Sequence, residues 1–79
     1  MPHIILKVWP GKSEEKKQQL AEEIKKLTMD ILETPESSIS VSYEVVKPED
    51  WAREVYKPDI LDKEENLYIK PGYVPEEFN

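Results

Sequence analysis

Apolar and polar side chains alternate near the start of the chain, and this pattern predicts a β-strand over residues 2–9. Ile4, Leu6 and Val8 share one face of the strand, because successive side chains of a strand point to opposite sides. We expect the strand to end at Pro10-Gly11, because proline removes a backbone donor and glycine permits a turn.

A repeat of apolar residues at three- and four-residue spacing follows, and it predicts one amphipathic helix. The apolar stripe comprises Leu20, Ala21, Ile24, Leu27, Thr28, Ile31 and Leu32. Ser13 is a favourable N-cap, and two glutamates follow it where the helix dipole favours negative charge. Thr34-Pro35 ends the helix, because the residue before a proline avoids helical geometry.

The clearest strand pattern covers residues 38–46, where apolar positions alternate with serines and Glu44. A strand, a helix and a second strand form a β-α-β unit, whose strands are expected to run parallel. The predicted fold class is therefore α/β, with a β-α-β unit of parallel strands as the specific expectation.

The pattern weakens after Pro48, which begins a short helical segment that carries Trp51 and Val55. We expect Pro58 to interrupt this segment. Residues 67–69 are expected to form a short C-terminal strand or turn, and Pro71-Gly72 a turn.

Length and composition limit the remaining possibilities. A chain of 79 residues predicts a single domain over residues 1–79 with a thin core, so we expect a second copy to help cover it. The absence of cysteine excludes thiol catalysis and disulfides, and a single histidine excludes the usual Cys/His zinc patterns. No signal peptide or membrane-spanning stretch is present, so a cytoplasmic location is expected. A net charge of -6 with one arginine disfavours nucleic acid as a partner.

Few catalytic arrangements remain possible. With two glycines in the whole chain there is no phosphate-binding loop, and no G-x-S-x-G motif occurs. The spacing of the paired glutamates is typical of side chains on a solvent-exposed face. Pro2 remains: removal of Met1, which a small second residue favours, leaves a free secondary amine that can act as a base. Burial and a nearby cation would lower the pKa of that amine toward neutrality. Lys12 is the candidate cation and Trp51 the candidate apolar wall.

Five short motifs, taken in order, resemble one family. They are Met1-Pro2-His3-Ile4, Gly11-Lys12-Ser13, Ser37-Ser38-Ile39-Ser40-Val41, Pro48-Glu49-Asp50-Trp51 and Lys70-Pro71-Gly72-Tyr73. Together they resemble the 4-oxalocrotonate tautomerase superfamily over nearly the whole chain, and its longer bacterial members in particular.

This resemblance implies a β-α-β subunit in which an amino-terminal proline shuttles a proton between enol and keto forms, without metal or cofactor. Pro2 matches that proline. Members with dicarboxylate substrates commonly carry arginines at the positions of Lys12 and Ser40. Lysine retains the positive charge but cannot form the bidentate contact that arginine makes with a carboxylate. Serine provides neither the charge nor this contact. Trp51 falls where the family places an aromatic residue of the pocket, which suits an apolar or aromatic substrate tail.

The sequence therefore predicts a cofactor-free enol-keto tautomerase, an isomerase, that acts on small 2-oxo acid enols of phenylpyruvate or 2-hydroxydienoate type. We expect a homodimer, no metal, and no nucleic acid or membrane partner. Two alternatives stay open: a non-enzymatic dimeric binding module on the same scaffold, and a dehalogenase or hydratase of the same superfamily. Without the family context, Lys12 reads equally well as a turn residue, Trp51 as core and Ser40 as the polar side of a strand. Arg53 is a further open point, since it is close enough in sequence to Trp51 to replace the missing arginine.

Overall fold

The computed structural model describes the whole chain, from Met1 to Asn79. The sequence predicts one domain, and within the chain the contacts gather in two compact units, Met1–Val45 and Val46–Asn79. None of the helices combines the length and apolar character that a membrane span requires.

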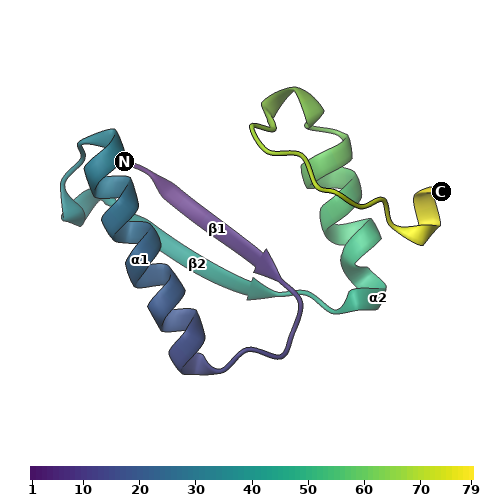
Figure 1. Ribbon diagram of the computed structural model, residues 1–79, viewed down its shortest axis with the longest axis horizontal. Helices are drawn as coiled ribbons and strands as arrows, with labels where there is room; N and C mark the ends of the chain where they lie inside the picture. Colours follow the sequence, from purple (N-terminus) through teal and green to yellow (C-terminus); the bar gives the residue numbers. More distant parts are fainter. The chain divides into compact units, whose positions relative to one another are not determined.

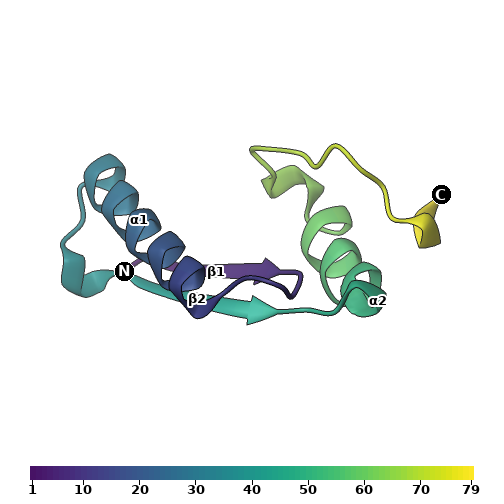
Figure 2. The same cartoon turned by 60° about the horizontal axis from the view of Figure 1, so that its bottom comes forward.

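The first unit is a β-α-β unit, as predicted. It consists of β1 (His3–Val8), α1 (Glu14–Leu32) and β2 (Ser40–Val45). The two strands pair in parallel, with a register that runs from His3 opposite Ser40 to Val8 opposite Val45. Helix α1 lies over one face of this two-stranded sheet, as Figures 1 and 2 show. The predicted α/β class and the parallel pairing are confirmed.

Both ends of α1 have a local explanation. The Ser13 hydroxyl oxygen accepts a hydrogen bond from the Lys16 backbone N–H at 3.2 Å, which confirms the predicted N-cap. Gly11 has φ 124° in the preceding turn, a conformation that side-chain-bearing residues rarely adopt. After the helix, Glu33 takes the left-handed conformation with φ 53°, where glycine is the usual residue.

Strand β2 begins later than the pattern predicts. Residues Glu36–Ser38 form a 3-10 turn instead of strand. The Ser38 hydroxyl and the Ser38 backbone N–H both donate to the Pro35 carbonyl, at 2.9 and 3.1 Å. Serine hydrogen-bonds to nearby backbone in this way readily, which competes with strand pairing.

The first unit leaves much apolar surface uncovered. No residue of α1, β1 or β2 is buried. The Lys17 ammonium lies 5.3 Å from the centre of the Tyr43 ring, so the Tyr43 side of the sheet faces α1. On the opposite side, Ile5 is 49% exposed. The predicted stripe on α1 is also incompletely covered, because Ile31 is 73% exposed.

The second unit begins with α2 (Pro48–Trp51), which continues as a wider π-helical segment over Ala52–Leu61. Two 3-10 turns follow, Glu64–Asn66 and Glu76–Phe78. The buried residues of the chain, Ala52, Val55 and Tyr56, all belong to the π-helical segment.

The expectation for Pro58 is wrong, and of the strand or turn expected at residues 67–69 the strand does not form. The helix does not stop at Pro58 but continues to Leu61. Proline removes one N–H donor from the segment, while wider hydrogen bonds such as Asp62 N–H to the Lys57 carbonyl, 2.9 Å, persist beyond it. Residues 67–69 form no strand, since the sheet contains β1 and β2 alone. The chain instead bends at Tyr68 and Ile69, whose side chains are almost fully exposed.

Candidate active site

Pro2 is fixed at the start of the sheet. It directly precedes β1 and is half-buried, and its carbonyl accepts a hydrogen bond from the Ser40 backbone N–H at 3.2 Å. Met1, in contrast, is fully exposed. The chain therefore presents Met1 to solvent while the second strand holds the proline behind it.

A polar pair lies directly beside Pro2. The Nδ1 atom of His3 is 2.7 Å from the Ser40 hydroxyl oxygen, within hydrogen-bonding distance. The two residues are opposite each other in the parallel register, and both are exposed. Ser40 and His3, neither of which is among the site residues predicted from the sequence, are thus joined at the same end of the sheet as Pro2. The contact follows from the parallel register of the two strands, which places His3 opposite Ser40.

Lys12 lies at the other end of β1. It is exposed and lies in the loop that leads from this strand to α1. Figure 1 shows this loop at the end of β1 that is distant from the N-terminus. A strand of six residues at a rise of about 3.3 Å per residue is about 20 Å long. Pro2 and Lys12 of one chain are therefore too far apart to contact the same small acid. Lys12 instead lines an open hollow of about 310 Å³, together with Val8, Lys16, Leu20 and Tyr43.

Trp51 ends α2 in the second unit and belongs to an aromatic cluster. Its indole N–H donates to the Tyr73 hydroxyl at 2.8 Å. The Tyr73 ring lies 5.7 Å from that of Tyr56, which in turn stacks on Phe78 at 5.6 Å. The sequence interpretation missed these partners of Trp51, although the Lys70-Pro71-Gly72-Tyr73 motif contains one of them.

Arg53 does not share the direction of Trp51. Helical residues two positions apart point to different sides of the helix. The Arg53 guanidinium pairs with carboxylates, at 3.1 Å from Asp50 and 3.9 Å from Glu54, and it is largely exposed. It lines a hollow of about 400 Å³ with Glu49, Ala52, Lys57, Glu77 and Phe78.

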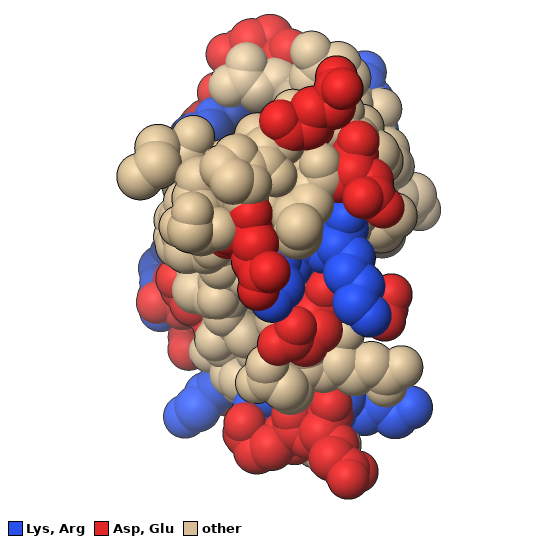
Figure 3. All heavy atoms as spheres, turned by 90° about the vertical axis from the view of Figure 1, so that its left-hand side faces the viewer, with Lys and Arg blue, Asp and Glu red and all other residues tan.

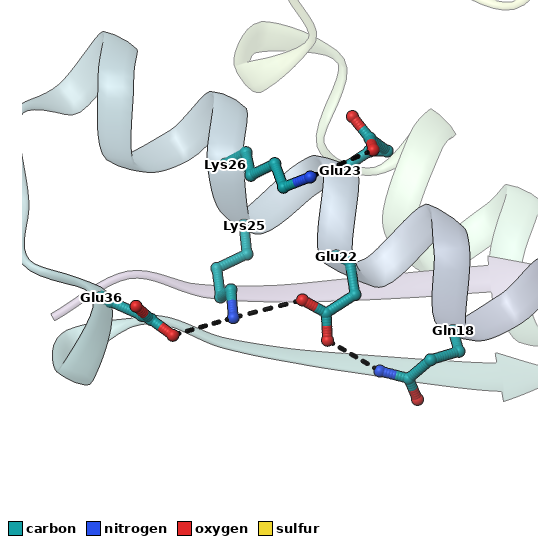
Figure 4. Close-up of polar contacts among 6 residues, drawn as sticks. All are labelled: Gln18, Glu22, Glu23, Lys25, Lys26 and Glu36. Carbon is teal, nitrogen blue, oxygen red and sulfur yellow. Dashed lines mark hydrogen bonds and ion pairs between the residues drawn. The ribbon is translucent and has the colours of Figure 1, made fainter.

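A network of charged side chains ties α1 to the turn before β2 (Figure 4). The Lys25 ammonium lies 3.0 Å from Glu36 and 3.2 Å from Glu22, and the Gln18 amide donates to Glu22 at 2.9 Å. The hydrogen bond from Lys25, followed by that from Gln18, lowers the pKa of Glu22. Hydrogen bonds to Glu36 and then Glu22 raise the pKa of Lys25. The network thus holds the segment that delivers Ser40 to its place in the sheet.

Charge is finely mixed elsewhere as well. Figure 3 shows acidic and basic side chains interspersed on one face of the molecule, with no continuous basic surface on that face. This agrees with the excess of 17 acidic over 11 basic residues in the sequence.

A protein-family model described as "Tautomerase enzyme" matches residues 2–57, a span that begins at Pro2 and includes both strands, α1 and Trp51. The chain belongs to the 4-oxalocrotonate tautomerase superfamily. The protein is therefore an enzyme of the isomerase class, as the sequence predicts.

Curated tautomerases are similar to this one over most of its length. It is 44% identical over 73 residues to a probable tautomerase of Xylella fastidiosa, covering 92% of this chain and 89% of the relative. It is 39% identical over 74 residues to tautomerase PptA of Cronobacter sakazakii, covering 92% and 97%. The predicted similarity to longer bacterial members of the superfamily is confirmed.

Solved structures of tautomerases support the fold assignment. TomN, a 4-oxalocrotonate tautomerase homologue in the tomaymycin biosynthetic pathway, superposes with a TM-score of 0.61 at 28% identity, over 63% of this tautomerase and 77% of that chain. DmpI from Helicobacter pylori superposes with a TM-score of 0.55 at 35% identity, over 58% and 78%.

Proposed function

We propose that this tautomerase interconverts the enol and keto forms of small 2-oxo acids, with the free amine of Pro2 as general base. The observation that carries the proposal is the placement of Pro2. It is the first residue of the family match, it is half-buried, and it is held to β2 by the Ser40 N–H. Loss of the exposed Met1 converts its amide nitrogen into a basic secondary amine.

The reaction needs one group that takes up and returns a proton. The Pro2 nitrogen removes the proton from the enol hydroxyl, the O–H electron pair forms the carbonyl, and the C=C electron pair takes the same proton back at carbon. A free α-amino group ordinarily titrates at about 7.7–8.0. Partial burial disfavours its charged form, which keeps more of the amine in the basic form at neutral pH.

The remaining predicted site residues enter this proposal with one constraint. Because β1, about 20 Å long, separates Lys12 from Pro2, a Lys12 that binds the substrate must come from a second copy of the chain. In that role its ammonium pairs with the substrate carboxylate, and the indole of Trp51 provides an apolar wall for the substrate tail.

A second copy is also what the uncovered surface of the first unit requires. Ile5 and Trp9 are about half exposed, and Leu27 and Ile31 on α1 are more exposed still. Exposed large apolar side chains on both sides of this unit favour an interaction with a second copy. We therefore include a homodimer in the proposed function.

The test is steady-state kinetics with the enol of phenylpyruvate, using protein whose intact mass shows that Met1 is absent. General-base catalysis contributes about 10²- to 10⁴-fold, so Pro2→Ala is expected to lower kcat/KM by at least about 100-fold. Circular dichroism should show that the variant remains folded. A variant with the wild-type rate would contradict Pro2 as the base, and wild-type protein without activity on enols of 2-oxo acids would contradict the substrate class.

A further inference from the structure

The polar side chains described next to Pro2 within one chain are those of His3 and Ser40. Ser40 contacts this end of the sheet twice: its backbone N–H donates to the Pro2 carbonyl, and its hydroxyl is 2.7 Å from His3 Nδ1. The imidazole is therefore held beside the proposed base. The bond to Ser40 occupies Nδ1 and leaves Nε2 available on an exposed ring.

We propose that His3 binds the carboxylate of the 2-oxo acid through Nε2, and that Ser40 positions the ring for this contact. This inference rests on the proposed function. When the Ser40 hydroxyl donates to Nδ1, the ring proton sits on Nε2, which can then donate to an anionic oxygen. Pro2 accepts a proton and donates none while it acts as a base, so the substrate anion needs a donor from a neighbouring group.

Among the groups of the same chain, the geometry favours His3 for this contact, and a Lys12 from a second copy would pair with the other oxygen of the same carboxylate. Lys12 of the same chain is at the far end of β1, and the guanidinium of Arg53 is paired with Asp50. His3 directly follows Pro2 in the sequence, so its backbone lies beside that of Pro2. His3 is thus a binding residue and Ser40 a positioning residue.

Two substitutions at His3 distinguish the roles of its two ring nitrogens. Asparagine places a polar atom near the Nδ1 position and nothing at Nε2, whereas glutamine reaches the Nε2 position. A hydrogen bond to a charged group corresponds to a factor of roughly tenfold or more in affinity. We expect His3→Asn to raise KM for the phenylpyruvate enol at least about tenfold with little change in kcat, and His3→Gln to restore much of the loss.

Ser40→Ala removes the hydroxyl group that contacts the His3 ring but retains the backbone N–H that donates to the Pro2 carbonyl. We expect a smaller increase in KM than for His3→Asn. Ser42→Ala is the matched control, because Ser42 lies two residues further along the same face of β2, opposite Ile5. It is expected to leave KM and kcat unchanged.

The methyl ester of the same enol tests whether the contact is to the carboxylate. The wild type should prefer the acid to the ester, and His3→Asn should lose most of that preference. If Pro2→Ala abolishes activity while His3→Asn and Ser40→Ala both match the wild type, the role of His3 is wrong and the proposed function stands. If Pro2→Ala is fully active, the proposed function itself fails.

A binding measurement gives a readout that does not depend on turnover. His3 is the only histidine of the chain, so its ring signals in an NMR spectrum need no further assignment. Addition of phenylpyruvate to the Pro2→Ala variant should shift these signals in a saturable manner. A second variant that also carries Ser40→Ala should require more ligand, whereas Ser42→Ala in its place should not. Ring signals that stay unchanged at saturating ligand would overturn the proposal.

Discussion

The two units of this tautomerase differ in where order and burial occur. The first unit, Met1–Val45, has regular strands and a 19-residue helix, and yet none of the residues in those elements is buried. The second unit, Val46–Asn79, is made of short or widened helical turns, and it holds Ala52, Val55 and Tyr56, the buried residues of the chain. Regular secondary structure and the buried residues are thus found in different units of this chain.

The difference bears on function. Pro2, His3 and Ser40 belong to the unit with regular hydrogen bonding, which fixes them through the parallel register. Trp51 belongs to the unit with the aromatic cluster. Proton transfer requires polar groups at an accessible position, and apolar packing for the substrate requires aromatic surface. The residues that we propose for proton transfer and carboxylate binding thus belong to the first unit, and the residue that we propose for the substrate tail belongs to the second.

The largest expected effect concerns the uncovered face of the first unit. Ile5→Lys places a charge on this face, where a second copy would have to bury it without a partner. We expect the dimer to dissociate at micromolar concentration, as measured by sedimentation velocity, while Ile5→Val remains dimeric. A wild-type monomer under these conditions, or an unchanged dimer in Ile5→Lys, would show that this face is not an interface.

The next effect concerns the core of the second unit. Tyr56 is buried and its ring contacts Tyr73 and Phe78. Tyr56→Ala should lower the free energy of unfolding by about 3–5 kcal/mol in chemical denaturation, the range for removing a large buried aromatic side chain. Tyr68→Ala, at a fully exposed position, should change it by less than about 0.5 kcal/mol. Equal costs at the two tyrosines would show that the buried Tyr56 ring does not form the core of the second unit.

A gain in stability is expected where α1 ends. Glu33 has φ 53°, and this conformation costs a residue with a Cβ atom roughly 1–2 kcal/mol compared with glycine. Glu33→Gly should therefore raise the free energy of unfolding by about 1 kcal/mol, which corresponds to about 4–8 °C in Tm for a chain of this size. Glu33→Ala removes the same charge but keeps the Cβ atom. If it stabilises as much as glycine, the charge and not the backbone conformation is responsible.

The smallest effect concerns the network of Gln18, Glu22, Lys25 and Glu36, whose ionised groups are exposed to solvent. The lowered pKa of Glu22 means that its contribution is complete above the ordinary value of 4.5 and is lost as the pH falls below it. The raised pKa of Lys25 means that its contribution is complete below 10.5 and is lost as the pH rises above it.

Thermal unfolding across pH checks this assignment. The stability difference between the wild type and Lys25→Met should be constant from about pH 5 to pH 10 and shrink on both sides of that range. Added salt should also reduce it, because exposed charges are screened. A difference that persists at pH 2 would mean that Lys25 acts through packing of its methylene groups instead.

The sequence was sufficient for features that depend on neighbours along the chain. The alternation over β1 and β2, the cap at Ser13 and the turn at Gly11 are local, and the structure confirms them. Pro58 was misjudged because a proline reports the loss of one donor and not how the turns around it widen. Of the strand or turn expected at residues 67–69, the strand does not form, because an apolar triplet has strand propensity but needs a neighbouring strand to pair with.

The candidate site depends on contacts between residues that are far apart in the sequence. His3 and Ser40 are 37 positions apart, and neither carries a recognisable motif by itself. Their contact follows only from the register of the two strands. The distance between Pro2 and Lys12 has the same origin. The two residues are only ten positions apart in the sequence, but the whole of β1 lies between them. The residue types in the sequence identified the candidate site residues, and the geometry of the strands determines which of these residues lie close together.

The central claim is that the free amine of Pro2 is the base, and one comparison tests it most directly. The same chain is prepared with Met1 removed and, by expression with methionine aminopeptidase inhibited, with Met1 retained, and intact mass verifies both forms. Every side chain from Pro2 onward is identical, but the Pro2 nitrogen is an amine in one form and an amide in the other. We expect kcat/KM for the phenylpyruvate enol to be at least about 100-fold higher in the form without Met1. Equal activity of the two forms would contradict the claim.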